Sequence, residues 1–251
     1  MAPALGPAVG GAVGYPGTGH VDDPYAVCTG LVDALLRAGG RVRQARVLRL
    51  AQDSDGPVTL TLEHGQALRC KQLVLCAGAW SKPLAASLGY RVPLDTERGY
   101  HITLGWQQQG GGLDGIGRLT KPIASTERNV IMTAMTMTMG LRMTGTVEFG
   151  GLHLPPDPRR FGLLRAQMQA LLPGVDASGA STWIGFRPSL PDHLSVMGAA
   201  PRHPGVFFAF GHQHLGLTLS GVTARLVQDM VLGRAPAIDM APCHVGRFAP
   251  W

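Results

Sequence analysis

The sequence predicts an α/β protein, α+β overall, in which a nucleotide-type domain is interrupted by an inserted domain built on an antiparallel sheet. Two short runs, at 73–77 and 206–211, are apolar on both faces, as buried parallel strands are. Between about 96 and 182 the chain instead alternates, as antiparallel strands do. Segments 1–95 and 183–251 are therefore expected to form one domain, and 96–182 the other.

The elements before residue 95 are expected to be a lead-in, a helix and several strands. Asp23 can cap the helix and Pro24 suits its first turn. Its apolar face is formed by Val27, Leu31 and Leu35. Strands are expected at 42–50 and 58–63, the second turning at His64–Gly65 into a hairpin. The run LVLCA at 73–77 follows, and Gly78 ends it.

The middle of the chain has the pattern of an antiparallel sheet. GYHITLGW alternates, a glycine-rich loop follows at 107–117, and Gly140 turns the chain before a returning strand at 142–149. A methionine stripe on one strand face is most simply core; it comprises Met135, Met137 and Met139.

Two further helices are expected, one on each side of residue 185. The first begins at Asp157–Pro158, and its stripe consists of Phe161, Leu164, Met168 and Leu172. The second runs from about 217 to 232, with Leu219, Val222, Leu226 and Met230 facing inward.

Composition limits the classes of function. The chain has 251 residues, 45% of them hydrophobic, and a net charge of +6 carried by scattered arginines. No basic block with interleaved aromatic residues occurs, which argues against nucleic acid and favours a small anionic ligand. The four cysteines form no C-x-x-C pair, and no apolar run is long enough to span a membrane. We therefore expect a cytoplasmic protein, with an inner-membrane surface as the alternative.

Three motifs can carry chemistry, and each has an ordinary structural reading. AFGHQHLGLTLSG joins a buried strand to a helix through glycines, which either admit a ligand to the backbone or simply make a turn. LVLCAGAWS ends a strand at a sheet edge where ligands bind, or is a plain strand end. His212 and His214 have H-x-H spacing but no neighbouring carboxylate or thiol, so no metal is expected.

The third motif, GFRPSLPDHLSVMG, holds Arg187 beside two prolines that stiffen its loop. A guanidinium offers a planar fork of donors that matches a carboxylate. The alternative is a structural ion pair, with Asp192 as the nearest partner. In the ERGYH segment, Arg98, Tyr100 and His101 either line a cleft or cap a strand.

In this order the motifs resemble the FAD-dependent D-amino-acid oxidase and dehydrogenase family. They are GHVDDPYA, LVLCAGAWS, ERGYHITL, GLRMTGTVEFGG, GFRPSLPDHLSVMG and AFGHQHLGLTLSG, and they cover nearly the whole chain. These motifs are most similar to those of bacterial D-amino-acid dehydrogenases, including those that act on D-hydroxyproline. The resemblance implies FAD, an inserted substrate domain at 96–182, and hydride transfer from the carbon bearing the amine to the flavin, after which the imine hydrolyses.

The resemblance also assigns site residues. It implies that Arg187 grips the substrate carboxylate and that Tyr100 and His101 lie where the substrate cleft begins. Contacts to the cofactor are implied for Val47, Ala77, Gly78, Trp80, Gly211, His212, Leu215, Gly216, Leu217 and Thr218. The electron acceptor is a quinone, a carrier protein or O₂, and a glycine- or sarcosine-type oxidase is the alternative activity.

One departure from the family pattern concerns the nucleotide. The family opens with a strand, G-x-G-x-x-G and a helix, and GGAVG at 10–14 does not serve because no hydrophobic strand precedes it. The FAD-binding Rossmann-like domain is therefore expected to be incomplete. Two readings follow: a partner subunit supplies the missing part, or the chain is a non-catalytic fragment that cannot bind FAD alone.

Overall fold

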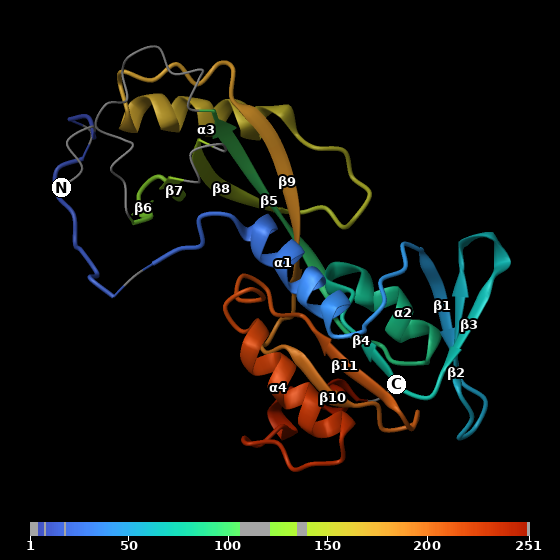
Figure 1. Ribbon diagram of the computed structural model, residues 1–251. Helices are drawn as coiled ribbons and strands as arrows, with labels where there is room; N and C mark the ends of the chain where they lie inside the picture. Colours follow the sequence, from blue (N-terminus) through green and yellow to red (C-terminus); the bar gives the residue numbers. More distant parts are fainter. Residues whose placement is uncertain (1–4, 8, 18, 106–120, 135–139, 250–251) are drawn as a thin grey trace. The chain divides into compact units, whose positions relative to one another are not determined.

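The computed structural model describes residues 5–7, 9–17, 19–105, 121–134 and 140–249, which form two compact units (Figure 1). Unit 1 comprises Met1–Val42, Arg98–Glu148 and Leu154–Gly185. Unit 2 comprises Arg43–Glu97, Phe149–His153 and Phe186–Trp251. Each unit has its own buried core and is described by itself. The division into FAD-binding and substrate-binding segments at 95/96 and 182/183 stays a prediction.

Unit 2 contains a three-stranded antiparallel meander. Its strands, in the order β1-β2-β3, are Val47–Ala51, Val58–Leu62 and Ala67–Cys70. The expected hairpin turns through the short helix η1 (Glu63–Gly65), where His64 and Gly65 have positive φ of 66° and 77°. The first strand begins at Val47, five residues later than predicted, and the residues before it form no strand.

The second sheet of unit 2 carries the two apolar runs. Its order is β10 (Val196–Ala199), β11 (Val206–Phe210) and β4 (Leu73–Leu75), and β11 is parallel to β4. β11 is buried throughout, as predicted. The prediction that β4 is buried on both faces is wrong: Val74 is 36% exposed. Among the described strands of this sheet, β4 lies at the edge.

Short helices complete unit 2. They are η2 (Gly78–Trp80), α2 (Ser81–Ser87), α4 (Ser220–Val231), η5 (Ala241–Cys243) and η6 (Val245–Phe248). α4 begins three residues later than predicted, and of its four expected inward residues only Leu226 is buried, whereas Val222 is half exposed. The core of the unit is built mainly around Tyr90, Phe208 and Phe210.

Unit 1 is centred on a five-stranded sheet in the order β6-β7-β8-β5-β9. The strands β5 to β9 are Asp95–Leu104, Ile123–Ser125, Val130–Ala134, Leu141–Phe149 and Ser181–Ser189. β6, β7 and β8 pair antiparallel, as predicted. Gly140, where the turn was predicted, has φ of 97° and room for no Cβ, which would lie 2.0 Å from the Leu104 carbonyl oxygen. The methionine stripe and the glycine-rich loop lie outside the described residues.

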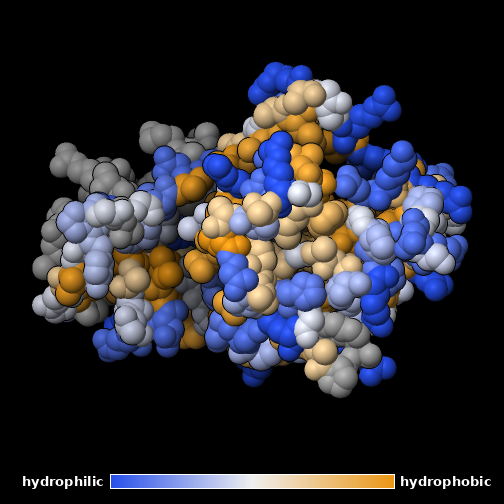
Figure 2. All heavy atoms as spheres, turned by 90° about the horizontal axis from the view of Figure 1, so that it is seen from below, coloured by the Kyte–Doolittle hydropathy of each residue, from blue (hydrophilic) through white to orange (hydrophobic). Residues whose placement is uncertain are grey.

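Two helices belong to unit 1, and they differ in burial. α3 (Pro158–Leu171) begins after Asp157, as predicted; Asp157 caps it, and the helix buries Leu164 and Met168. α1 (Pro24–Arg37) is also capped as predicted, since Asp23 accepts a hydrogen bond from the Ala26 N–H at 2.9 Å. None of its residues is buried, and Leu31 is 62% exposed. Exposed apolar side chains of this kind are part of the surface that Figure 2 colours by hydropathy.

Candidate functional site

Two strand ends meet at one edge of the second sheet of unit 2. In the parallel pair, Leu75 of β4 is in register with Phe208 of β11, so Gly78 and Gly211 follow at the same carboxyl edge. Gly78 has φ of 54°, and a Cβ there would meet nothing within 4 Å. Gly211 has φ of 83°, and its Cβ would lie 2.6 Å from a Leu190 methyl carbon. This edge is where open α/β sheets bind ligands.

The turn after β11, residues 211–218, is anchored near its start by two hydrogen bonds. The Gln213 N–H donates to the Pro188 carbonyl at 3.2 Å, which ties the turn to strand β9. His212 Nε2 lies 3.1 Å from Thr223 Oγ1 of α4, and burial lowers the pKa of His212. Among the described residues, the N–H groups of Gly216, Leu217 and Thr218 have no acceptor. Such free donors suit an acceptor-rich or negatively charged ligand group.

Arg187 is the third component, and its guanidinium is unpaired. No described residue accepts a hydrogen bond from it, and Nη1 is buried without a partner. Burial lowers the pKa of Arg187, and the charge of Glu97 acts in the opposite direction. The alternative of an ion pair with Asp192 is wrong, because Asp192 Oδ2 accepts a hydrogen bond from Arg247 Nε at 2.7 Å. Arg187 is thus a half-buried cation without an acceptor in the described part of the chain.

The neighbours of Arg187 connect it to both strand ends. Phe186 meets Trp80 edge to face, with ring centroids 5.5 Å apart. Glu97 Oε2 lies 3.2 Å from Nε2 of His214, in the 211–218 turn. The segments 77–80, 186–188 and 211–218 therefore form one site within unit 2. Among the described residues, no cluster of ligating side chains could hold a metal.

Glu97 is a site residue that sequence reasoning missed. It lies on the part of β5 that belongs to unit 2, with its side chain 17% exposed. Its signal was a carboxylate at an alternating position of a strand that is otherwise mostly buried. Its partner His214 is 117 residues away in the chain, which local patterns do not reveal.

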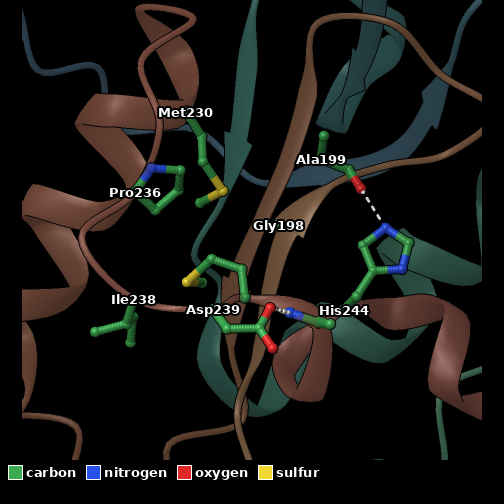
Figure 3. Close-up of a pocket in the computed structure, with 9 residues that line it drawn as sticks. Gly198, Ala199, Met230, Pro236, Ile238, Asp239 and His244 are labelled. Carbon is green, nitrogen blue, oxygen red and sulfur yellow. Dashed lines mark hydrogen bonds between the residues drawn. The ribbon is translucent and has the colours of Figure 1, made fainter.

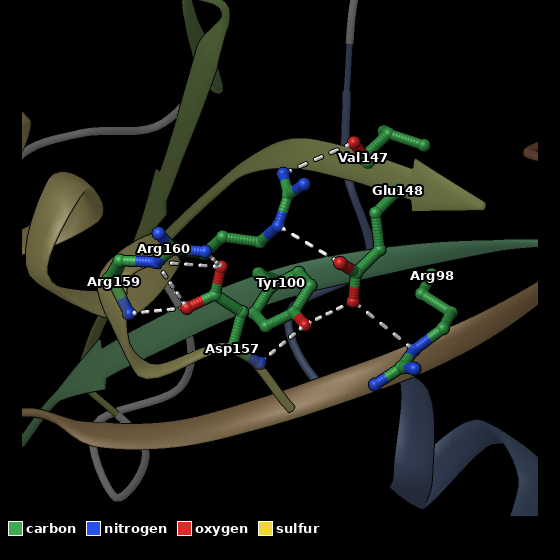
Figure 4. A network of polar contacts seen from close by, with 7 residues as sticks. All are labelled: Arg98, Tyr100, Val147, Glu148, Asp157, Arg159 and Arg160. Carbon is green, nitrogen blue, oxygen red and sulfur yellow. Dashed lines mark hydrogen bonds and ion pairs between the residues drawn. The ribbon is translucent and has the colours of Figure 1, made fainter. Parts of the chain in front are cut away.

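Tyr100 and His101 belong to unit 1. The Tyr100 hydroxyl donates to Glu148 and accepts from the Asp157 N–H at 3.0 Å (Figure 4). Burial, and then the hydrogen bond to Glu148, raise the pKa of Tyr100. His101 stacks on Trp183 with centroids 4.7 Å apart. The predicted roles of both residues in substrate binding stay predictions.

Glu148 draws two arginines into the same network. Its oxygens lie 3.4 Å from Arg98 Nε and 3.2 Å from Arg160 Nε. The Arg98 side chain is fully buried, and the Arg160 guanidinium also donates to the Val147 carbonyl at 3.2 Å. The network connects β5, β8 and α3, and these contacts should stabilise unit 1.

A pocket of about 440 Å³ in unit 2 contains none of the predicted site residues (Figure 3). Its walls are mainly apolar and include Met230, Ile238 and Met240. His244 at its rim contacts the Ala199 carbonyl at 3.1 Å through Nε2 and accepts from the Gly246 N–H through Nδ1. Both ring nitrogens are thus engaged by the backbone.

Val47, the predicted adenine contact, is the first residue of β1 and packs on the core of unit 2.

The parallel strand ends and the glycine turn define an α/β protein with two glycines at the carboxyl edge of a sheet. Residues 1–230 match the family described as FAD dependent oxidoreductase (DAO). The chain belongs to this family, and FAD is the family's cofactor.

Relatives and solved structures agree with this membership. A D-amino-acid oxidase of Bradyrhizobium diazoefficiens is 34% identical over 92% of this chain and 53% of its own length. A D-amino acid dehydrogenase of Paramagnetospirillum magneticum is 32% identical over 80% and 46%. The fold resembles glycine oxidase from Geobacillus kaustophilus, with a TM-score of 0.74 at 23% identity, covering 89% of this chain and 58% of that one. The chain thus spans about half the length of these two relatives.

The residues of unit 2 fit the ring end of FAD. The open space at Gly78 and the unengaged N–H groups of 216–218 leave backbone donors accessible at one sheet edge. A planar, acceptor-rich ring requires such donors and such close approach to backbone. In residues 1–95, the sequence contains no G-x-G-x-x-G of the kind that cradles a pyrophosphate.

Proposed function

We propose that this chain forms the substrate-carboxylate and flavin-ring half of an FAD-dependent D-amino acid oxidoreductase. The observation that carries the proposal is the unpaired guanidinium of Arg187 beside the 211–218 turn. A half-buried cation without an acceptor is costly unless a ligand supplies one. A carboxylate matches the fork of a guanidinium in shape and charge.

The proposed division of labour follows from position. Arg187 orients the substrate through its carboxylate, so that the C–H bond of the carbon bearing the amine faces the site. The 211–218 turn and the segment 77–80 hold the ring through backbone donors, and Trp80 covers the approach from β4. FAD, when bound, accepts the hydride. Val47 is proposed to contact adenine, and Tyr100 and His101 to border the substrate.

The substrate is proposed to be a D-amino acid. D-Proline and D-hydroxyproline are the first candidates, because the sequence motifs resemble those of bacterial D-amino-acid dehydrogenases. The names of the relatives, D-amino-acid oxidase and D-amino acid dehydrogenase, support the class and leave O₂, a quinone and a carrier protein as proposed acceptors. No helix among the described residues is long and apolar enough to cross a membrane. A cytoplasmic site, or one at a membrane surface, stays a proposal.

The test is flavin reduction. The chain is loaded with FAD, passed through gel filtration, and mixed anaerobically with D-amino acids while the visible flavin band is followed. The expected result is bleaching by D-proline or another D-amino acid, with much slower bleaching but equal flavin content in Arg187→Lys. Equal bleaching rates in the two proteins would refute the role of Arg187. A flavin-loaded protein bleached by no amino acid would refute the activity.

We further propose that the flavin site is completed by a polypeptide segment that adds a parallel strand to the free edge of β4. Val74 and Cys76 are exposed at this edge strand, and the chain spans about half of its relatives. An unpaired strand edge is a template for another strand. Co-expression with a strand–G-x-G-x-x-G–helix segment from a relative should give a co-eluting, yellow complex. Val74→Pro should abolish it; a complex unaffected by Val74→Pro would contradict pairing at β4.

A further inference from the structure

Glu97 lies in the electrostatic field of Arg187 without forming a direct ion pair with it. The two residues interact through their charges, and Glu97 acts to raise the pKa of Arg187. Among the described residues, the only hydrogen-bond or ion-pair partner of the Glu97 carboxylate is His214, at 3.2 Å from Oε2. The guanidinium and the second carboxylate oxygen, Oε1, both lack a hydrogen-bond partner in the described part of the chain. Arg187 thus keeps free donors, and Glu97 keeps a free acceptor, while each lies in the field of the other's charge.

A zwitterion fits between two such groups. In an α-amino acid the carboxylate and the ammonium are separated by one carbon, so they must be met by a cation and an anion that are close but not in contact. We propose that Glu97 recognises the substrate amine while Arg187 binds its carboxylate. This inference rests on the proposed function and adds to it the residue that selects amino acids over other carboxylic acids.

His214 is a positioning residue in this arrangement. Its Nε2 contacts one oxygen of Glu97 and fixes the plane of the carboxylate, which leaves Oε1 for the ammonium. The N–H of Gln213, the residue directly before His214, donates a hydrogen bond to the Pro188 carbonyl of β9. The 211–218 turn therefore connects the strand that carries Arg187 to the histidine that contacts Glu97.

Selectivity follows from charge. A simple carboxylic acid gains the contact with Arg187 but brings a negative charge toward Glu97, whereas an amino acid compensates both residues. A hydrogen bond to a charged group changes affinity by about tenfold or more. Loss of the Glu97 charge should therefore weaken the binding of the amino acid but not the binding of the plain carboxylic acid.

The experiment compares D-proline with cyclopentanecarboxylate, which has the same ring shape and carboxylate but no nitrogen. Both are titrated into the full chain and followed by backbone amide NMR shifts. The wild type should bind D-proline more tightly, and Glu97→Gln should reduce that preference by about tenfold or more. Glu63→Gln, the same charge change on an exposed turn of unit 2, should leave it unchanged.

His214 supplies a second readout. His214→Ala should reduce the preference for D-proline, and His214→Gln, which keeps a donor, should restore part of it. A preference that persists in Glu97→Gln would overturn the inference and leave carboxylate binding by Arg187 intact. Failure of both ligands to bind the wild-type chain would instead overturn the proposed function, and this inference with it.

Discussion

Each unit contains an arginine on a strand of the five-stranded sheet, and the two arginines differ in whether a carboxylate lies against them. In unit 1, the fully buried Arg98 has its Nε 3.4 Å from an oxygen of Glu148, which also engages Arg160 and the Tyr100 hydroxyl (Figure 4). This is an ion pair without a hydrogen bond, because the Arg98 nitrogens have no hydrogen-bond partner among the described residues. In unit 2, Arg187 is half buried and has no acceptor among the described residues. Both segments, ERGYH and GFRPS, are polar clusters in the sequence. What separates a structural cluster from a binding cluster is whether the protein itself supplies the counter-charge.

The largest expected effect is on the network around Glu148. Glu148→Gln leaves two arginines without their carboxylate in and beside the core of unit 1, which should lower the free energy of unfolding by about 3–5 kcal/mol. Chemical denaturation measures this loss. Glu127→Gln, the same change on an exposed turn of unit 1, is the control and should have almost no effect. Equal stability of Glu148→Gln and the control would show that the network is not structural.

The next effect is on the hydroxyl that bridges the network. Tyr100→Phe leaves the Asp157 N–H and Glu148 without this partner, and should cost about 1–3 kcal/mol of stability. Because Tyr100 is also proposed to border the substrate, binding of D-proline should weaken, measured in the same samples by titration. Unchanged ligand binding together with the loss of stability would confine Tyr100 to the network and contradict its proposed place beside the substrate.

A smaller effect tests whether Asp192 is the partner of Arg247 or of Arg187. Asp192→Asn breaks the pair with Arg247, which is partly exposed and therefore contributes about 1 kcal/mol or less. Because Asp192 is not the partner of Arg187, ligand binding should not change. A marked gain in carboxylate affinity would mean that Asp192 competes for Arg187 after all.

The pH dependence of stability sharpens the same point. Burial is the largest single influence and acts to raise the pKa of Asp192, but the hydrogen bonds from Arg247 and from the Leu194 N–H, together with the charge of Arg247, outweigh it, and the net shift is downward. The stabilisation is thus present above the unfolded pKa of about 4 and is lost as pH falls through the lower folded pKa. Asp192→Asn should flatten the acid side of the stability profile, as measured by thermal unfolding. A profile identical to that of the wild type would show that the Asp192–Arg247 pair does not contribute to the stability of unit 2.

The smallest expected effect concerns His212. Burial lowers its pKa, so the folded state holds the neutral ring and binds fewer protons than the unfolded state. Stability should therefore fall as pH drops below about 6.5, the ordinary histidine value. His212→Gln should reduce this slope while keeping a polar partner for Thr223. An unchanged slope would show that His212 does not contribute.

Local features of the fold could be predicted from the sequence, and long-range pairings could not. The cap of α3 at Asp157, the turn at Gly140 and the buried strand β11 all follow from neighbouring residues. The partner of Asp192 is 55 residues away, and that of Glu97 is 117 away. The exposure of Val74 likewise depends on where β4 lies in its sheet, which its own apolar sequence does not specify.

The most direct test is a titration of cyclopentanecarboxylate into the wild-type chain and Arg187→Lys, followed by amide NMR shifts. The wild type should show saturable shifts confined to residues 185–190 and 211–218, and the variant should bind about tenfold or more weakly with unchanged stability. Equal affinity in both proteins, or shifts that cluster around Arg98 and Glu148 instead, would contradict the assignment of the carboxylate site to Arg187.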